Sequence, residues 1–325
     1  MLRTFFRRLF NAVILILAVV VLNFLLIHLA PGDPAEVIAG EMGGATQEML
    51  DEIRALYGLD KPVMTQLGIY LGRVMQGDLG QSFYYNTPVT SLIIARLWPT
   101  LLLVTTSLIL ALTGGTFLGV LASRNPEGIF SNFVTIFALV GYSLPVFWSG
   151  LMLVILFASV IPIFPVSDMY DILLEGGPLA KALDVAHHLV LPAFTLAIIY
   201  LAQYSRLSRA SMLEVLGADY IRTARAKGVS EPKVIAKHAL RNAILPIVTI
   251  AGLQFGSLLS GAVLVESVFN WPGLGTLAFQ SILRRDFPTI LGILLFSSIL
   301  VIIANLVTDF CYQLVDPRIK VGNEA

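Results

Sequence analysis

The stretch from Thr100 to Ala122 reads TLLLVTTSLILALTGGTFLGVLA and contains no charged residue. A helix needs about 20 apolar residues to cross the hydrocarbon layer of a membrane, so this stretch is long enough for one crossing. The whole chain has a matching composition, because 57% of its 325 residues are hydrophobic and 13% are charged. Soluble domains carry about 25% charged residues. The sequence therefore predicts a membrane protein.

Five further stretches, on both sides of this one, are also apolar enough to cross. They are Leu9–Ala30, Ile129–Ile161, Leu189–Tyr204, Ile244–Val265 and Thr289–Thr308. Two crossings and a turn need more than about 40 residues, so we expect Ile129–Ile161 to form one long helix that Pro145 kinks. The prediction is an all-α membrane protein with six transmembrane helices. Its first helix is expected to be retained rather than cleaved as a signal peptide.

Lysine and arginine residues orient these helices. With six crossings and the N-terminus inside, the inner segments carry two thirds of the 21 Lys and Arg residues. Eight of them lie between Arg206 and Arg241. Cytoplasmic segments of membrane proteins carry such an excess, so we expect both the N- and the C-terminus to be cytoplasmic. A hairpin at Ile129–Ile161 would place the segment with eight charges outside, against this rule.

The crossings divide the chain into three parts. These are an N-terminal tail with the first helix (1–30), an external helical region (31–99) and a transmembrane domain (100–325) with a long cytoplasmic segment at 205–243.

Local signals predict short helices in the external region. A cap at Asp33-Pro34 begins one helix, an apolar stripe over Met49–Tyr57 before Gly58 marks a second, and a stripe over Val63–Val74 between Pro62 and Gly77 marks a third. These helices either pack over a pore mouth or form a structural cap with no role in substrate handling.

Several kinds of functional group are missing from the sequence. The predicted crossings have no Asp, Glu, Lys or Arg in their interiors, and Glu266 and Asp309 lie only at their ends. Proton- and ion-driven transporters retain such charges as relays, so secondary transport is disfavoured. The sequence has no Gly-Lys-Ser/Thr nucleotide-binding loop, no His-Glu-x-x-His and no Gly-x-Ser-x-Gly. His187-His188 lacks an evident third metal ligand, and zero net charge disfavours nucleic acid. We expect no catalytic, cofactor-binding or metal-binding residue in this chain.

The cytoplasmic segment 205–243 predicts two helices joined by a tight turn. The first helix includes Asp219–Lys227 and ends at Gly228, since glycine adopts the left-handed conformation of a helix C-cap. Ser230 is then expected to cap a second helix that runs from about Lys233 to Asn242 and meets the fifth crossing.

Two interpretations of this segment remain open on these signals. Small residues (Ala224, Ala226 and Gly228) leave room for another surface, with basic residues around them. The segment either docks a partner or is a solvated loop that sets topology.

The same segment carries a family resemblance. The run DYIRTARAKG at 219–228, followed by HALRNAILP at 238–246, resembles the cytoplasmic signature of ABC importer permeases. Arg222-Thr223-Ala224 stands in the Glu-Ala-Ala place of the general signature and Leu245-Pro246 comes later than its spacing, as in the peptide/nickel branch. The narrower resemblance is to the first permease subunit of dipeptide, oligopeptide and nickel importers. Supporting motifs are APGDP at 30–34, LYGLDKP at 56–62, GDLGQS at 77–82, ESVFNWPGLG at 266–275 and DPR at 316–318.

The resemblance implies a division of labour between subunits. Such a permease pairs with a second, similar permease, two cytoplasmic ABC ATPase subunits and an external solute-binding protein, in the cytoplasmic membrane of a bacterium or archaeon. ATP and Mg²⁺ would bind to the partner ATPase subunits, with no cofactor in this chain. The residues implied to dock the ATPase are Asp219, Tyr220, Arg222, Thr223, Ala224, Arg225, Ala226, Lys227 and Gly228.

The transport pathway and substrate are less defined by the sequence. Four uncharged residues are candidates for the pathway lining: Tyr142, Gln203, Gln254 and Asn305. Each could equally bridge helices within the bundle. The resemblance favours di- or oligopeptides, with nickel or another small solute as the alternative. Two alternative functions from other classes of protein are a stand-alone carrier or channel and an intramembrane enzyme. No catalytic pair is evident for the enzyme.

Overall fold

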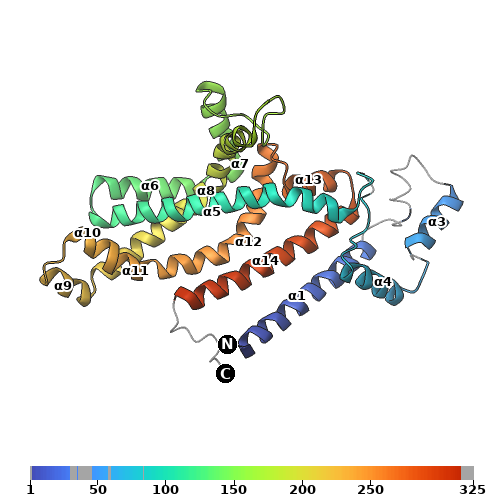
Figure 1. The fold of residues 1–325 in the computed structure, drawn as a ribbon, viewed down its shortest axis with the longest axis horizontal. Coiled ribbons are helices and arrows are strands. Elements are labelled where there is room, and N and C mark those ends of the chain that lie inside the picture. Colours follow the sequence, from blue (N-terminus) through green and yellow to red (C-terminus); the bar gives the residue numbers. More distant parts are fainter. Residues whose placement is uncertain (1, 30–34, 36–45, 58–59, 83, 316–325) are drawn as a thin grey trace. The chain divides into compact units, whose positions relative to one another are not determined.

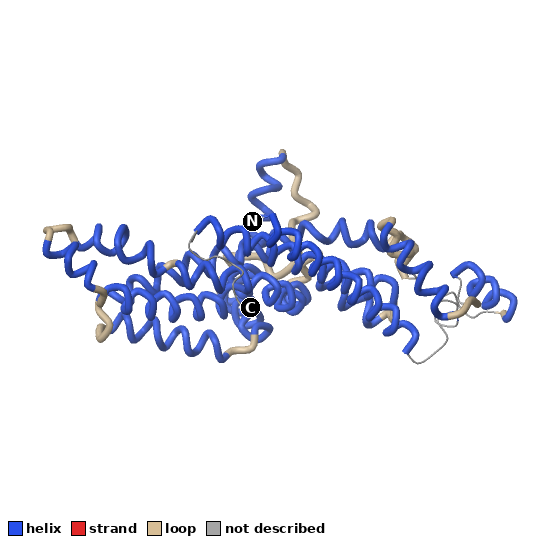
Figure 2. Tube along the Cα trace, turned by 90° about the horizontal axis from the view of Figure 1, so that it is seen from below, coloured by secondary structure: helices blue, strands red, loops and turns tan. Residues whose placement is uncertain are grey.

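The computed structural model describes residues 2–29, 35, 46–57, 60–82 and 84–315. The described part is helical, and its one pairing of extended residues is an isolated bridge between Gln81 and Pro88 (Figures 1 and 2). The predicted all-α class is confirmed for this part of the chain. The expected cap at Asp33-Pro34 and the expected stop at Gly58 lie outside the described residues.

The helices follow one another along the chain with short connections. They are α1 (Leu2–Leu29), α3 (Gln47–Tyr57), α4 (Val63–Met75), α5 (Val89–Arg124), α6 (Ile129–Ser143), α7 (Val146–Val154), the π-helical η1 (Ile155–Val160), α8 (Pro178–Leu216), α9 (Asp219–Ala226), α10 (Glu231–Lys233), the π-helical η2 (Val234–Ala239), α11 (Leu240–Ala243), α12 (Leu245–Val268), α13 (Leu274–Leu283) and α14 (Phe287–Val315).

Three described helices are long and apolar enough to cross a membrane, namely α5, α8 and the part of α14 from Phe287 to Leu306. Two bent helix pairs would bring the number of candidate spans to five if each pair forms one span: α6 with α7–η1, and Glu231–Ala243 with Leu245–Ala251. The first helix contributes a shorter apolar stretch, Phe10–Leu26. The six apolar stretches found in the sequence correspond to these helices and helix pairs, except that Ala30 lies outside the described residues and Ile161 follows the end of η1.

The third stretch differs from its prediction. We expected one long helix kinked at Pro145, but α6 ends at Ser143, α7 begins at Val146, and the two axes differ by 108°. Leu144 and Pro145 both adopt extended backbone, with ψ of 135° and 136°. A residue before proline is pushed out of the helical region, and proline donates no backbone hydrogen bond, so the helix breaks here rather than bending.

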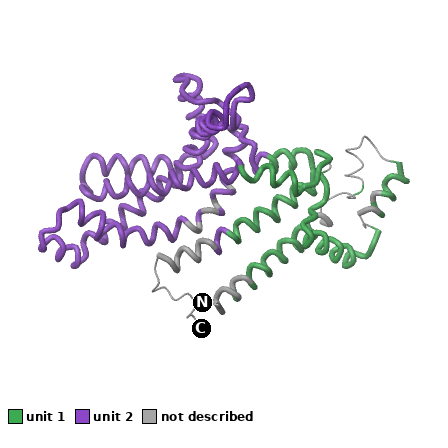
Figure 3. The backbone as a smooth tube through the Cα atoms, viewed as in Figure 1, with its two compact units in different colours: residues 1–98, 277–303 green, residues 99–276, 304–325 purple. Residues whose placement is uncertain are grey.

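The described chain divides into two compact units (Figure 3). Unit 1 holds Met1–Trp98 and Leu277–Ile303, and unit 2 holds Pro99–Thr276 and Ala304–Ala325.

In unit 1, polar contacts connect α1 and the loop after α4 to α14. Asn23 of α1 is 2% exposed and donates to the carbonyl of Leu291, 3.1 Å away. The buried carboxylate of Asp286, just before α14, accepts from the hydroxyls of Ser82 and Thr289. Pro62 precedes α4, and Gly77 follows it with a φ of +77°, as the sequence predicted.

In unit 2, the backbones of α5 and α8 approach each other closely. A Cβ atom built on Gly115 would lie 2.7 Å from the carbonyl oxygen of Leu201, and one on Gly119 would lie 2.5 Å from that of Ser205. Ser208 donates to the carbonyl of Thr116 across the same contact. Small residues permit this approach in membrane helices, where close packing drives association.

Candidate coupling site

The segment predicted to be cytoplasmic, 205–243, is called the coupling segment below, and it begins within the last part of α8. This helix has 39 residues, which corresponds to about 58 Å, and it continues for twelve residues past Tyr204, where the apolar stretch ended. Its N-terminus lies beside loop 161–177 and its C-terminus leads to α9, so these two regions of unit 2 are far apart (Figure 1). The predicted inner and outer segments of unit 2 therefore lie at different ends of one helix.

The turn after α9 has the geometry of a Schellman motif. Gly228 adopts a φ of +76°, its N–H donates to the carbonyl of Arg225, and the N–H of Val229 donates to the carbonyl of Ala224. These two bonds satisfy the last carbonyls of the helix, and only a residue that tolerates positive φ suits the position. The predicted stop at Gly228 is confirmed.

One side of α9 is buried within the chain itself. Ile221 and Ala224 pack in an apolar cluster with Met212 of α8 and with Val234 and Ile235 of η2. Ala224 is 8% exposed, so the interpretation that its small side chain leaves room for an approaching surface is wrong for this residue. The helical period of 3.6 residues turns it inward together with Ile221.

The other side of α9 is polar and open. The residues of the candidate docking set that are exposed are Asp219, Tyr220, Arg222, Thr223, Arg225, Ala226, Lys227 and Gly228. The hydroxyl of Tyr220 accepts a hydrogen bond from Asn242, which ties α9 to the end of α11. The cluster beneath fixes α9 in place while this surface stays available.

The second helix of the segment begins two residues earlier than predicted. It runs from Glu231 through α10, η2 and α11 to Ala243. Ser230 occupies the expected N-cap position, but its side chain makes no capping bond, and its carbonyl accepts from the N–H groups of Lys233 and Val234.

An exposed ion pair closes the turn between these two helices. Arg225 donates to both carboxylate oxygens of Glu231, at 2.7 and 3.1 Å. These hydrogen bonds lower the pKa of Glu231 below its ordinary value, and the charge of Arg225 adds to the effect.

The lowered pKa predicts a pH dependence for this pair. Its contribution to stability is complete above the ordinary glutamate pKa of about 4.3 and is lost as the pH falls through the lower pKa of the folded protein. We expect Glu231→Gln to lower the melting temperature slightly at pH 7, because exposed pairs contribute little and salt screens them. Thermal unfolding should show this difference shrinking in acid, and an unchanged difference at low pH would contradict the assignment.

The pathway candidates are only partly brought together. Gln254 of α12 donates to Gln203 of α8 at 3.0 Å, and both side chains are partly buried. This pair bridges two helices, which was the alternative to a pathway role. Tyr142 and Asn305 are exposed, and no described contact joins them to the glutamine pair.

A buried carboxylate lies at the other end of α12. Glu266 is fully buried, and it accepts from the Thr100 hydroxyl at 2.6 Å and from the N–H groups of Gly275 and Thr276 at 2.7 and 3.0 Å. It therefore caps the N-terminus of α13, where an acidic group is favoured. A Cβ atom on Gly273 would overlap this carboxylate, which explains the glycine. The motif at 266–275 is thus a connection between α12, α13 and α5.

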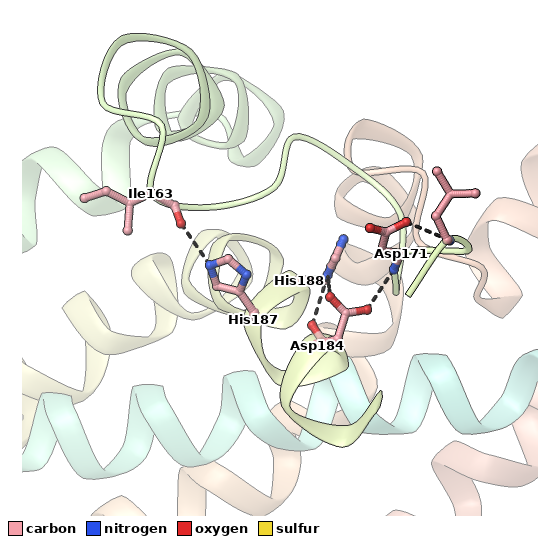
Figure 4. A network of polar contacts seen from close by, with 6 residues as sticks. Ile163, Asp171, Asp184, His187 and His188 are labelled. Atoms are coloured by element: carbon pink, nitrogen blue, oxygen red, sulfur yellow. Dashed lines mark hydrogen bonds and ion pairs between the residues drawn. The ribbon is translucent and has the colours of Figure 1, made fainter. Parts of the chain in front are cut away.

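The adjacent histidines each have a structural partner (Figure 4). A ring nitrogen of His187 lies 2.8 Å from the carbonyl of Ile163, and one of His188 lies 2.9 Å from the carbonyl of Asp184, whose carboxylate also accepts from the N–H of Asp171. Within the described residues no group of three potential ligands could hold a metal ion. This network links loop 161–177 to the start of α8, beside a surface hollow of about 570 Å³.

Sequence reasoning missed the connections that involve distant residues. The ion pair of Arg225 with Glu231, the bond of Tyr220 to Asn242 and the capping by Glu266 were not predicted. For Glu266 a signal existed: an acidic residue at the end of an apolar stretch, followed closely by Pro-Gly-x-Gly. The spacing of Gly115 and Gly119 is a second such signal, since small residues four apart often mark helix contacts in membranes.

In unit 2, the long apolar helix α8 leads into the polar helix α9, which an apolar cluster holds in place. This arrangement is typical of the membrane component of a multi-subunit transporter. Comparison with known proteins shows the family. Residues 115–321 match the family described as binding-protein-dependent transport system inner membrane component, and residues 1–105 match its N-terminal part. The chain belongs to this family.

Its relatives include peptide permeases over nearly their full length. The chain is 40% identical to the dipeptide transport system permease protein DppB of Escherichia coli strain K12, covering 98% of this chain and 99% of that protein. It is 40% identical to the oligopeptide transport system permease protein AppB of Bacillus subtilis strain 168, covering 97% and 98%. The chain is accordingly a non-catalytic permease subunit of an ABC transporter, whose ATPase is a separate subunit. Both relatives are bacterial, so the archaeal alternative gains no support from them.

Solved structures share the fold. The inward-facing MetNI methionine ABC transporter matches with a TM-score of 0.54 at 18% identity, covering 69% of this chain and 96% of the matched chain. At this identity the likeness concerns the fold alone.

Proposed function

We propose that this chain forms one half of a peptide-conducting path in an ATP-driven importer of the inner membrane. It crosses the membrane six times, with both termini inside, and the third crossing is the broken pair α6 and α7–η1. A second, similar permease completes the path, two ATPase subunits bind ATP and Mg²⁺, and an external solute-binding protein delivers the peptide. Support for the substrate comes from the dipeptide and oligopeptide permeases to which the chain is similar.

The observation that carries the proposal is the way α9 is held. Its inner side is fixed by an apolar cluster and its end by a Schellman turn, while its outer side exposes polar and basic groups. A rigid projection of this kind transmits a movement of an attached ATPase to α8, which precedes it, and through the segment Glu231–Ala243 to α12. The exposed residues from Asp219 to Gly228 are the docking surface in this proposal.

Transport by the reconstituted complex tests the substrate. We expect uptake of labelled di- and oligopeptides into vesicles that contain both permeases and both ATPases, and only with ATP and the binding protein. Uptake of nickel without uptake of peptide would show that nickel, not peptide, is the substrate. Uptake by this chain alone without ATP would overturn the proposal.

The Schellman turn at Gly228, called the coupling turn below, gives a second test. Gly228→Val forces a β-branched residue to positive φ, which costs about 1–3 kcal/mol, although the space around a Cβ at this position is open. We expect the protein to insert normally but peptide uptake and binding-protein-stimulated ATP hydrolysis to fall together.

Two variants control this experiment. Gly228→Asn should retain most activity, because asparagine tolerates the left-handed region. Gly217→Val changes a glycine of ordinary φ (−81°) at the end of α8 and should have the smaller effect. Normal uptake by the Gly228→Val complex would contradict the proposed role of the turn.

A further inference from the structure

Three basic residues form a row on the helix between the coupling turn and the membrane. Lys233, Lys237 and Arg241 are spaced four apart along the segment Glu231–Ala243, and all three are exposed. Residues four apart lie on one side of a helix. The buried residues of the same segment are Val234, Ile235, Ala239 and Ala243, which pack on α8 and α9. We call the three cations the basic stripe.

The basic stripe differs from the two arginines nearer the turn, Arg222 and Arg225, in having no partner among the described residues. Arg222 pairs with Asp219 at 3.4 Å and Arg225 pairs with Glu231 at 2.7 Å, so their charges are balanced within the chain and only Lys227 adds a positive charge at the turn. No described residue forms an ion pair or a side-chain hydrogen bond with Lys233, Lys237 or Arg241. Like charges at this spacing repel one another, so an anionic partner outside the chain would stabilise the row.

Geometry brings the stripe close to the membrane surface. The helix continues into α12 at Leu245. Counted back from there at the α-helical rise, Arg241, Lys237 and Lys233 lie at most about 6, 12 and 18 Å along the axis, because the π-helical η2 rises less per residue. The helix bends by 46° against the start of α12. If α12 lies along the membrane normal, the bend reduces the heights of the three residues above the level of Leu245 to about 4, 8 and 13 Å. The headgroup layer is about 5–8 Å thick. All three charges then lie within the layer or within one Debye length, about 8 Å, of it.

We propose that the basic stripe binds the phosphate groups of anionic phospholipids in the inner leaflet. This inference rests on the proposed function only for the orientation of α12. Lysine meets a phosphate as a point charge and arginine as a planar donor of two parallel hydrogen bonds, so both suit lipid headgroups. Bound lipid holds the helix that connects α9 to α12 and thereby fixes the angle at which the coupling turn projects.

The test compares lipid dependence in the complete transporter. The complex is placed in nanodiscs of phosphatidylcholine with increasing phosphatidylglycerol, and two readouts are taken: peptide-stimulated ATP hydrolysis and the phosphatidylglycerol retained by the permease in native mass spectrometry. For the double variant Lys237→Gln, Arg241→Gln we expect about a 25-fold loss of apparent phosphatidylglycerol affinity, since each of the two cations near the surface contributes about fivefold. The matched control Lys61→Gln, Lys181→Gln removes two exposed cations elsewhere and should behave like the unmodified complex.

Each outcome decides the question. Lys237→Arg with Arg241→Lys keeps both charges and should restore lipid retention, which separates charge from folding. Unchanged lipid dependence in the Gln double variant would overturn the proposal. So would loss of the ATPase subunits from this variant in phosphatidylcholine alone, because the stripe would then bind the ATPase. Lipid retention needs no substrate, so a failure of peptide transport would leave this test intact.

Discussion

Glu266→Ala should destabilise the protein by about 3–5 kcal/mol, because it leaves several buried donors without an acceptor. The carboxylate is fully buried and accepts from one hydroxyl and two backbone N–H groups. A buried polar group that loses its partner costs about 1–3 kcal/mol. Thr100, which donates to Glu266, also accepts from the N–H of Leu274 at 2.7 Å, so the loss would disturb a connected network.

Thermal unfolding in detergent and the yield of monodisperse protein measure this effect. Glu266→Gln should be milder than the alanine variant, because the amide oxygen still accepts and the shape is kept. The matched control is Glu175→Ala, an exposed glutamate in the loop before α8, whose change should stay within about 0.5 kcal/mol. Equal stability of the Glu266→Ala and Glu175→Ala proteins would refute the capping role.

Gly119→Leu should prevent α5 and α8 from packing. A Cβ atom on Gly119 would lie 2.5 Å from the carbonyl oxygen of Ser205 and 2.6 Å from the Cβ of Ser208, distances that real atoms do not reach without a shift of the backbone. Overpacking by even a methyl group costs about 1–3 kcal/mol, so Gly119→Ala should already lower stability by that amount. A leucine cannot be accommodated unless the helices separate.

The control for this prediction is a glycine in an open helix position. Gly72 of α4 has no atom within 4 Å of a built Cβ. Gly72→Ala should therefore be neutral or stabilising, because alanine favours helix by about 1 kcal/mol over glycine. Melting temperatures of the two alanine variants should move in opposite directions or differ clearly. If the Gly119→Ala and Gly72→Ala proteins have the same melting temperature, α5 and α8 do not approach each other as closely as described.

Local signals predicted much of the fold, including the end of α9. The apolar stretches located the long helices, Pro62 located the start of α4, and Gly228 located the end of α9, because each of these effects acts within one or two turns of chain. The same signals predicted that α9 would be a short polar helix with a basic end. They did not give the size of the break at Pro145, since the direction of the chain after a proline depends on what the next helix packs against.

These local signals could not predict contacts between side chains that are far apart in the sequence. Glu266 and Thr100 are 166 residues apart, and Ser82 and Asp286 are 204 residues apart. The small size of Ala224 predicts an open surface, whereas the cluster around Met212 buries this residue. Which side of a short helix faces inward depends on the neighbouring elements as well as on its own period.

The sequence by itself determined that this protein is helical, that it belongs in a membrane, and where α9 ends. Composition and caps are properties of contiguous residues, so they can be read from the chain alone. Only the tertiary structure decided which polar groups meet, which face of α9 remains open, and how closely α5 approaches α8. Those features arise from contacts between distant segments, whose energies depend on distances of a few tenths of an ångström that local sequence does not encode.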